Sequence, residues 1–416
     1  MRDGESDSEI ITALDLGTTK VCALLGLARE GEVTVLGMGL SPSHGMQKGT
    51  VVDIEATVDA ITRAVTEAEA QAGVKAGPVY ASIGGNHIHA ASSQAMVTIA
   101  NRDHGITEED FRRVIEQAQN ISLPSDHEIL HAIVQEYSVD NQDGIRNPVG
   151  MWGSKLEARV RIVTGAITCI QNVIRSVQRA NLPFGGLILQ ALASERAVLT
   201  HEEAELGVVS LDMGGGTTDI AVIIGKTLRH VAVITQGGNQ ITKDVAFGLR
   251  IPFGSAEELK KRAGSCMVSL VRDDETVHIP ATGGRQPRSV PRKSLARIIE
   301  PRIEEILGHV SEELKSCGCD EEALGGGLVL TGGCASLPFV VEKAEQVFQQ
   351  LSARVGEPVR LPGAPDILIA PQFATAVGLL SEAAEQRRRT GPGPRRPAWG
   401  GMMKWLREFF RESRQE

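Results

Sequence analysis

The sequence predicts a two-lobed α/β protein built from a duplicated domain, with one subdomain inserted into the first copy. Apolar strand segments alternate with helical segments, as in α/β architectures. A strand followed by Asp-x-Gly, paired Thr and a second strand occurs at residues 14–20 and again at 211–219. Asp15 and Asp212, the acids of the two copies, lie 197 positions apart, and a repeat of that period indicates duplication of a whole domain.

The first half is predicted to contain three strands, a helix and a fourth strand, in order at residues 10–17, 21–28, 33–40, 54–72 and 79–85. The pattern changes at Gly84. A long alternating strand then leads to a helix that begins at Thr107, a hydroxyl N-cap followed by acids in the first turn. Further strands follow near 128–139 and 155–163. We therefore expect an inserted subdomain over residues 84–162.

The second half repeats the strand pair from Val208 and continues with helices expected at 238–248, 255–262 and 291–316. A third glycine-rich segment, residues 325–339, is expected to join a strand to a helix that starts near Ser336. Residues 385–398 are rich in Arg, Pro and Gly without periodicity, which predicts a disordered, self-repelling linker.

The charge of the chain is unevenly distributed. Its net charge is −9, yet residues 385–416 contain nine Lys or Arg against four Glu, a net charge of +5, and the remainder carries −14. An acidic body argues against binding to nucleic acid. A basic tail that holds four of the aromatic residues suggests a second, separate role.

The six cysteines lack the close spacings of a disulfide framework, so we expect reduced thiols, as in the cytosol. Cys317 and Cys319 could form half of a zinc site, but no second Cys or His pair lies near them in the sequence. The acidic N-terminal segment is unlike a signal peptide, and no run of 18 apolar residues predicts a membrane span.

The two Asp-Gly loops have the residue types of a phosphate site. A turn with Gly and paired Thr directs several N–H groups and hydroxyls into one concavity. Asp15 would face the same spot, and a carboxylate beside a polyphosphate requires a cation between them. Because Mg²⁺ keeps several of its waters, Asp15 is expected to orient a water on the metal. Two such loops would clamp a triphosphate between the halves of the protein.

The third glycine loop would complete a nucleotide site. Gly332 and Gly333 lack side chains and would let a flat ring lie against the backbone. None of the three loops has the Walker pattern. A single Asp-x-Gly turn is more often a plain hairpin loop. Two matched loops in matched strand contexts, followed by the third, argue against that alternative here.

With these loops the chain resembles the superfamily of actin, sugar kinases and heat-shock-chaperone ATPases. Within it, the chain resembles the FtsA family of bacterial cell-division proteins over residues 9–414. The segments that carry this likeness are LGVVSLDMGGGTTDIAV, NPVGMWGSKLEARVRIVTG, GGRQPRSVPRKSLARIIEPRIEEIL and TAVGLL, together with the terminal amphipathic stretch. The resemblance implies an actin-like, ribonuclease H-like duplicated ATPase fold with a relocated subdomain.

The resemblance also implies a division of the chain. Subdomain IA of the first lobe would span 8–83, continued at 163–206 and about 366–384, with the inserted subdomain IC at 84–162. Subdomain IIA of the second lobe would span 207–241, continued at about 322–365, with its outer subdomain IIB at 242–321. The linker at 385–398 and an amphipathic helix at 399–414 would follow.

The ATP and Mg²⁺ sites are implied residue by residue. Asp15 and Asp212 would hold the metal through water, and Asp212 with Gln190 would orient the attacking water. Because Gln cannot act as a base at neutral pH, any ATP hydrolysis should be slow. Glu257 and Lys260 match the nucleotide-side helix, although such i, i+3 pairs are also common on solvated faces. The implied phosphate and adenosine contacts are Gly17, Thr18, Thr19, Lys20, Gly214, Gly215, Gly216, Thr217, Thr218, Glu257, Lys260, Gly332 and Gly333.

Family membership would imply a cell-division scaffold on the cytoplasmic face of the inner membrane. Members polymerise, bind the tail of the tubulin-like division protein FtsZ through the outer subdomain, and recruit later division proteins through the relocated one. A partly acidic FtsZ tail needs a basic face to receive it. The candidates are Arg285, Arg288, Lys293, Arg297 and Arg302, with Lys293 and Arg302 preferred. The same residues could instead form a solvated helix face.

Two other functions are alternatives for a chain of this superfamily. A small-molecule kinase of the same superfamily would need a catalytic Asp as base for the acceptor hydroxyl, and no additional Asp lies in a glycine-marked loop of the first half. An actin-like shape or pilus-assembly protein would not be expected to combine this insert with a terminal amphipathic helix.

The terminal stretch has the pattern of a membrane-surface helix. A helix over this segment would measure roughly 20 Å, too short to cross a bilayer, and would lie flat on an anionic membrane. Packing on the protein's own core is the alternative, which a flexible basic linker in front disfavours. The apolar stripe consists of Met402, Trp405, Leu406, Phe409 and Phe410, with Met403 beside it and Trp399 before it.

Overall fold

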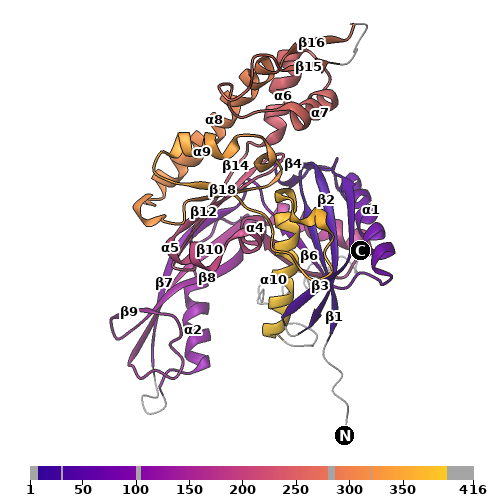
Figure 1. Cartoon of the computed structure of the whole chain (residues 1–416). Coiled ribbons are helices and arrows are strands. Elements are labelled where there is room, and N and C mark those ends of the chain that lie inside the picture. Colours follow the sequence, from indigo (N-terminus) through magenta and orange to yellow (C-terminus); the bar gives the residue numbers. More distant parts are fainter. Residues whose placement is uncertain (1–7, 30, 100–104, 280–285, 320, 391–416) are drawn as a thin grey trace.

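The computed structural model describes residues 8–29, 31–99, 105–279, 286–319 and 321–390. It contains two lobes, each built on a five-stranded sheet, and an inserted subdomain with a four-stranded sheet of its own. The two-lobed α/β class predicted from the sequence is therefore confirmed. Figure 1 shows the insert and the outer helices of the second lobe projecting in opposite directions from the centre of the molecule.

The sheet of the first lobe has the strand order β11-β6-β1-β2-β3. Its first three strands form an antiparallel meander, and β6 and β11 add parallel strands beyond β1. The bounds are β1 (Glu9–Leu16), β2 (Lys20–Arg29), β3 (Glu32–Pro42), β6 (Val79–Ile83) and β11 (Phe184–Leu189), with a short hairpin of β4 (Met46–Gln47) and β5 (Thr50–Val51) after β3.

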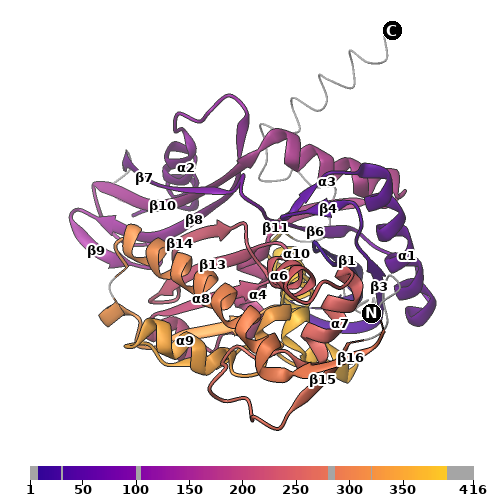
Figure 2. The same cartoon turned by 90° about the horizontal axis from the view of Figure 1, so that it is seen from above.

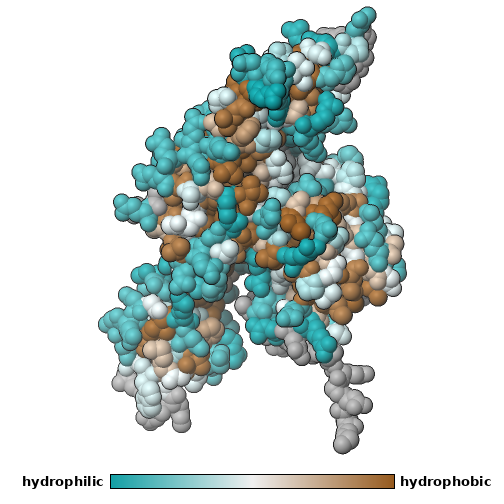
Figure 3. Space-filling view, viewed as in Figure 1, coloured by the Kyte–Doolittle hydropathy of each residue, from teal (hydrophilic) through white to brown (hydrophobic). Residues whose placement is uncertain are grey.

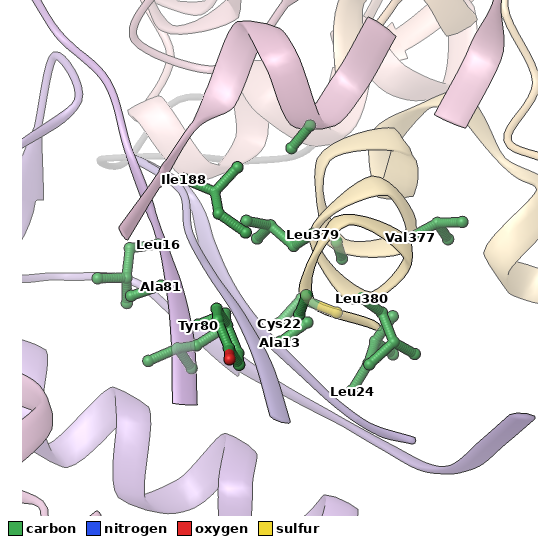
Figure 4. Close-up of a cluster of buried hydrophobic side chains, with 14 of the residues drawn as sticks. Ala13, Leu16, Cys22, Leu24, Tyr80, Ala81, Ile188, Val377, Leu379 and Leu380 are labelled. Carbon is green, nitrogen blue, oxygen red and sulfur yellow. The ribbon is translucent and has the colours of Figure 1, made fainter. Parts of the chain in front are cut away.

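Helices cover both faces of this sheet. They are α1 (Ile54–Ala72), α3 (Ile167–Arg179), α4 (Gln190–Val198) and α10 (Ala374–Thr390). Leu25 of β2 pairs with Gly37, which abuts α1, whereas the next residue, Gly26, abuts Leu380 of α10. Because successive strand residues face opposite sides, α1 and α10 lie on opposite faces. Figure 4 shows Leu24 and its buried neighbours in the layer beneath α10.

The second lobe repeats this arrangement with the order β14-β13-β12-β17-β18. Again three antiparallel strands are followed by two parallel ones, and the acids of the two loops hold equivalent register positions: Asp15 lies opposite Cys22, and Asp212 lies opposite Asp219. The two sheets therefore agree in strand order, strand direction and register, as the predicted duplication requires. The bounds are β12 (Val208–Met213), β13 (Thr218–Ile224), β14 (Thr227–Ile234), β17 (Leu328–Thr331) and β18 (Ala353–Val355).

The outer helices of the second lobe agree with the sequence except at one place. The expected helix near Ser336 is wrong, because residues Gly333–Ser336 form a 3₁₀ turn and α9 begins only at Val340. Pro338 disfavours helical backbone at Leu337, and Leu337 is indeed extended. The remaining elements are α5 (His201–Leu206), α6 (Gly238–Leu249), α7 (Phe253–Ala263), β15 (Thr276–Ile279), β16 (Arg288–Pro291), α8 (Arg292–Ser316) and α9 (Val340–Phe348).

The insert has its own hydrophobic core and the strand order β7-β10-β8-β9. Its helix begins as predicted, because the Thr107 hydroxyl accepts from the Asp110 N–H and the Asp110 carboxylate accepts from Thr107 in return. Figure 2 shows the insert beside β11 and α3 of the first lobe. Its elements are β7 (His89–Thr98), α2 (Glu108–Gln119), β8 (His127–Val139), β9 (Gln142–Ile145) and β10 (Lys155–Ala166).

The C-terminal part of the chain corrects one prediction. Residues 385–390, expected to belong to the linker, are helical instead, since α10 continues to Thr390, and the rest of the expected linker lies outside the described residues. The last turns of α10 dock on the first lobe, where Arg387 forms an ion pair with Glu9. The expected amphipathic helix, including Trp399, lies outside the described residues. Among the helices that are described, none is long and apolar enough to cross a bilayer.

Candidate functional site

A cavity of about 340 Å³ lies between the two lobes, and all three glycine loops line it. The first lobe contributes Asp15, Gly17, Thr18, Thr19, Lys20, Gln190, Gln372 and Thr375, among others. The second contributes Asp212, Gly214, Gly215, Thr217, Asp219, Asn239, Glu257, Lys260, Gly332, Gly333 and Cys334, among others. Of the residues expected here from the sequence, Gly216 and Thr218 alone are absent from this lining.

The first loop is a tight turn with a cation next to its acid. The Gly17 N–H donates to the Lys20 carbonyl at 3.0 Å, and the Lys20 ammonium lies 3.1 Å from the Asp15 carboxylate. Lys20 also lies 5.1 Å from the centre of the Phe373 ring. Burial would lower the pKa of Lys20, but the attraction of Asp15 outweighs it and raises this pKa. The charge of Asp15 is therefore compensated within the protein.

The second loop has the same turn without the cation. The Gly214 N–H donates to the Thr217 carbonyl at 2.9 Å, as Gly17 does in the first loop. Burial and the nearby Asp15 raise the pKa of Asp212 to about 6, although the Thr375 hydroxyl donates to its carboxylate at 2.8 Å. Burial and the nearby Asp212 raise the pKa of Asp219 to about 8. The two acids of this loop therefore have no paired cation, and their ionised forms are disfavoured.

The two loops touch each other across the cavity floor. A Cβ at Gly216 would lie 2.6 Å from the Thr18 hydroxyl oxygen, so only glycine permits the observed approach. Thr218 is instead a supporting residue of the loop, because its buried hydroxyl donates to the Gln236 carbonyl at 2.9 Å. The prediction that Thr218 faces the cavity is corrected accordingly, since successive residues of β13 point to opposite faces and the next residue, Asp219, lines the cavity.

Gln190 is the first residue of α4 and is almost fully buried at the cavity wall. Its side-chain amide donates to the Ser82 hydroxyl at 3.2 Å and to the Leu16 carbonyl at 3.4 Å. The Ser82 hydroxyl in turn donates to Asp15 at 3.3 Å. Gln190 is thus connected to the acid of the first loop.

Glu257 and Lys260 of α7 lie on the second-lobe side of the cavity and pair at 2.7 Å. Lys260 is buried and also donates to the Gly238 carbonyl at 3.0 Å and to the Thr242 hydroxyl at 2.9 Å. Burial opposes ionisation of Glu257, but Lys260 lowers its pKa below the usual value. The alternative of a solvated helix face is excluded for Lys260 by its burial.

The third loop approaches the second with no room for a side chain. Gly332 has a φ of +81°, and a Cβ on it would lie 2.4 Å from an Asp212 carboxylate oxygen. The Cys334 thiol lies 3.5 Å from the Gly214 carbonyl. The predicted adenosine loop and the second phosphate loop therefore form one continuous wall.

Sequence reasoning missed several lining residues. Asp219 is the last residue of the repeated segment 211–219, so its register opposite Asp212 could have been inferred from the hairpin. Thr375 comes from α10, 163 positions beyond Asp212. It opens the segment TAVGLL, and Cys334 follows Gly332 and Gly333 in the third loop, but neither was assigned to the site; Gln372 and Asn239 carry no pattern of their own.

The basic residues expected to meet a partner lie on α8 and the adjacent β16. Lys293 pairs with Asp273 at 2.6 Å, and Arg302 pairs with Asp244 at 2.6 Å. Arg288 donates to the Leu249 carbonyl, and Arg297 is exposed. Arg285 lies outside the described residues. Figure 3 shows mostly hydrophilic side chains at this end of the molecule.

Solved structures of similar shape agree with this architecture. A chain of the PilM-PilN type IV pilus biogenesis complex matches with a TM-score of 0.65 at 15% identity, covering 90% of this chain and 98% of that one. MreB5 of Spiroplasma citri, bound to ADP, matches with a TM-score of 0.57 at 13% identity, covering 92% and 99%. Two lobes of this topology around a shared cavity define an actin-like protein.

Sequence comparison narrows this class. The family model described as cell division protein FtsA matches residues 209–378, and the model described as SHS2 domain inserted in FTSA matches residues 85–164, close to the expected insert. Cell division protein FtsA of Neisseria meningitidis serogroup B is 41% identical over 415 residues, which cover 98% of this chain and all of that protein. The chain belongs to the FtsA family of cell division proteins.

Proposed function

We propose that the chain binds ATP with Mg²⁺ between its lobes and acts as a nucleotide-dependent scaffold that links the division machinery to the membrane. The observation that carries this proposal is the convergence of three glycine loops and the carboxyls of Asp15, Asp212 and Asp219 on one cavity. The ADP bound by the related fold of MreB5 supports it.

Each wall of the cavity suits one part of the nucleotide. Gly17, Thr18 and Thr19 face Gly214 and Gly215, so backbone N–H groups and hydroxyls of both lobes are available to phosphates. Gly332, Gly333, Glu257 and Lys260 form the remaining wall and suit the adenosine. A ligand that contacts both lobes favours a conformation in which the lobes lie close together, because it binds that conformation more tightly than one in which they are apart.

The carboxylates fit a divalent cation. One oxygen of Asp219 is buried and has no hydrogen-bond partner among the described residues, and Asp15 and Asp212 repel each other. Mg²⁺ bound with the phosphates would neutralise this charge and the charge of the phosphates. No three acidic, His or Cys side chains among the described residues are grouped so as to hold a metal ion directly, so Asp15 and Asp212 would hold it through water.

Slow hydrolysis is the expected chemistry. Gln190 is held by Ser82 and Leu16, so its position at the wall is defined. An amide can align a water but cannot accept its proton at neutral pH. We therefore propose that ATP serves chiefly to set the conformation, with hydrolysis as a slow reset.

The membrane role is assigned to residues 399–414. One short amphipathic helix holds a membrane weakly and reversibly. Self-association of nucleotide-bound bodies would bring many tails to one surface, where each binds at high effective concentration. The scaffold would then carry the FtsZ tail on its outer subdomain and later division proteins on the insert.

Sedimentation with liposomes that contain anionic lipid tests the scaffold. The full chain should sediment with Mg²⁺ and ATP, and a variant ending at residue 398 should remain in the supernatant. Asp212→Ala should sediment less and form no polymers on lipid in electron micrographs. Equal sedimentation of the shortened chain would refute the membrane role, and ATP consumption stimulated by a sugar or carboxylate would favour the kinase alternative.

Charge reversal tests the partner site. Lys293→Glu combined with Arg302→Glu should weaken binding of an FtsZ tail peptide by about tenfold or more, since charge-assisted hydrogen bonds are lost and repulsion is introduced. Lys315→Glu, exposed near the other end of the same helix α8 and outside the candidate set, is the matched control and should leave binding unchanged. If Arg297→Glu alone weakens the peptide and the double variant does not, the site lies on the other side of that helix.

A further inference from the structure

A histidine of the insert is hydrogen-bonded to the backbone beside the nucleotide cavity. The ring Nε2 of His131, on β8, accepts from the Leu189 N–H at 3.1 Å, across 58 positions of sequence. Leu189 is the last residue of β11, and Gln190 follows it as the first residue of α4. The insert therefore contacts the backbone directly in front of a residue that lines the cavity.

The Leu189 N–H needs this partner. β11 is the edge strand of its sheet and pairs only with β6. Leu189 is fully buried, so water cannot satisfy an outward N–H at this edge. Burial lowers the pKa of His131 to about 4, which keeps the ring neutral and able to accept. The His131 ring thus supplies the hydrogen-bond acceptor that the buried Leu189 N–H needs at the end of the edge strand.

From Gln190 the hydrogen bonds continue to the first loop. Gln190 donates to the Ser82 hydroxyl at 3.2 Å and the Leu16 carbonyl at 3.4 Å. Ser82 accepts from the Leu16 N–H at 2.8 Å and donates to Asp15 at 3.3 Å. The Gln190 side chain has little room to move, because it packs closely against Gly84: a Cβ at Gly84 would lie 2.1 Å from the Gln190 side-chain oxygen.

We propose that His131 is a positioning residue for the nucleotide cavity, which fixes Gln190 and through it the Asp15 loop by holding the Leu189 N–H. This inference rests on the proposed nucleotide binding. It makes the insert part of the support of the cavity: a displacement of β8 changes nucleotide affinity, and bound nucleotide restrains β8 by the same coupling free energy.

The test measures the affinity of the full chain for a fluorescent ATP analogue with Mg²⁺. His131→Leu removes the acceptor and should weaken binding about fivefold, the equivalent of one ordinary hydrogen bond. His131→Gln offers a side-chain oxygen instead and should restore most of the affinity. His89→Leu, an exposed histidine on β7, is the matched control and should bind as the unaltered chain does. If His131→Leu does not fold, His131→Asn, whose shorter side chain cannot reach Leu189, replaces it.

A double-mutant cycle with Gln190→Ala decides the route. If His131 acts through Gln190, the double variant should bind no more weakly than Gln190→Ala alone. Additive losses, or unchanged affinity in His131→Leu, would overturn the inference while leaving nucleotide binding intact. An unaltered chain that binds no nucleotide would overturn the proposed function as well. Faster hydrogen exchange at Leu189 in His131→Leu, measured without nucleotide, is expected in addition, and unchanged exchange would contradict the contact.

Discussion

The two phosphate loops share a backbone but differ in charge. Each has a glycine that donates to the residue three positions on, and each acid stands opposite the residue seven positions on. In the first loop Asp15 has Lys20 beside it and a thiol, Cys22, opposite. In the second, Asp212 faces another acid, Asp219. The two loops thus share one geometry, but only in the first does the acid have a cationic side chain as its partner.

Neutralising Asp212 and Asp15 in turn should show the largest difference between the two loops. Asp212→Asn should weaken Mg²⁺-dependent ATP binding by about 100-fold, as expected for a carboxylate that orients metal-bound water. It should also raise the melting temperature of the nucleotide-free protein, because a buried charge without a cation is removed. Asp15→Asn should weaken binding too, but lower the melting temperature, since Lys20 loses its partner. Calorimetry with and without nucleotide measures both effects, and equal stability changes would refute the difference.

Asp219→Asn should stabilise the nucleotide-free protein by about 1–2 kcal/mol at pH 7. The buried carboxyl has a pKa of about 8 in the folded chain, so folding forces it to take up a proton. The gain is reduced because the new amide leaves a buried donor unpaired. Cys22→Ser, at the matching register of the first loop, is the control and should not stabilise. Urea unfolding measures both variants.

Lys20→Met should destabilise the nucleotide-free protein by about 1 kcal/mol. Lys20 is one quarter exposed, so solvent weakens its pair with Asp15, while its contact with Phe373 is retained by an apolar side chain. Combining it with Asp15→Asn should cost little more than Asp15→Asn alone. Independent, additive losses in urea unfolding would show that Lys20 does not act through Asp15.

The smallest effect concerns pH. The folded pKa of Asp219 is raised, so its folded form binds more protons than the unfolded chain between the ordinary carboxyl pKa and about 8. Its contribution to stability therefore falls as pH rises through this window. The stabilisation by Asp219→Asn should accordingly be greater at pH 7.5 than at pH 6.5, by about 0.5–1 kcal/mol. A difference that does not change with pH would mean that Asp219 is ionised throughout.

Local signals allowed much of the fold to be predicted. The predicted limits of α1 agree with the structure, in which Asp53 caps its start and Gly73, at a φ of +68°, ends it. The helix of the insert was found from its N-cap, Thr107. The start of α9 and the end of α10 were predicted wrongly, because a neighbouring residue sets the first and a distant contact sets the second. Pro338 delays α9, and docking on the first lobe extends α10 into a segment whose composition is that of a linker.

The site divides in the same way. Most glycines and threonines of the loops were identified, because the residue types that form a turn are adjacent in the sequence. Asp219 was missed since its importance lies in the register that sets it against Asp212. Thr375 opens the segment TAVGLL, but its role in the site was missed, because only the packing of α10 brings its hydroxyl to the second lobe.

The sequence by itself determined the caps, the strand pairs, the duplicated loops and the residue types able to bind phosphate, because each depends on neighbours within a few positions. The tertiary structure alone decided which of these groups meet and in which state of ionisation. The pKa values of Asp212 and Asp219 are raised by burial, and burial results from the packing of the folded chain. Likewise, His131 reaches Leu189 only because the insert packs on the edge of the first sheet.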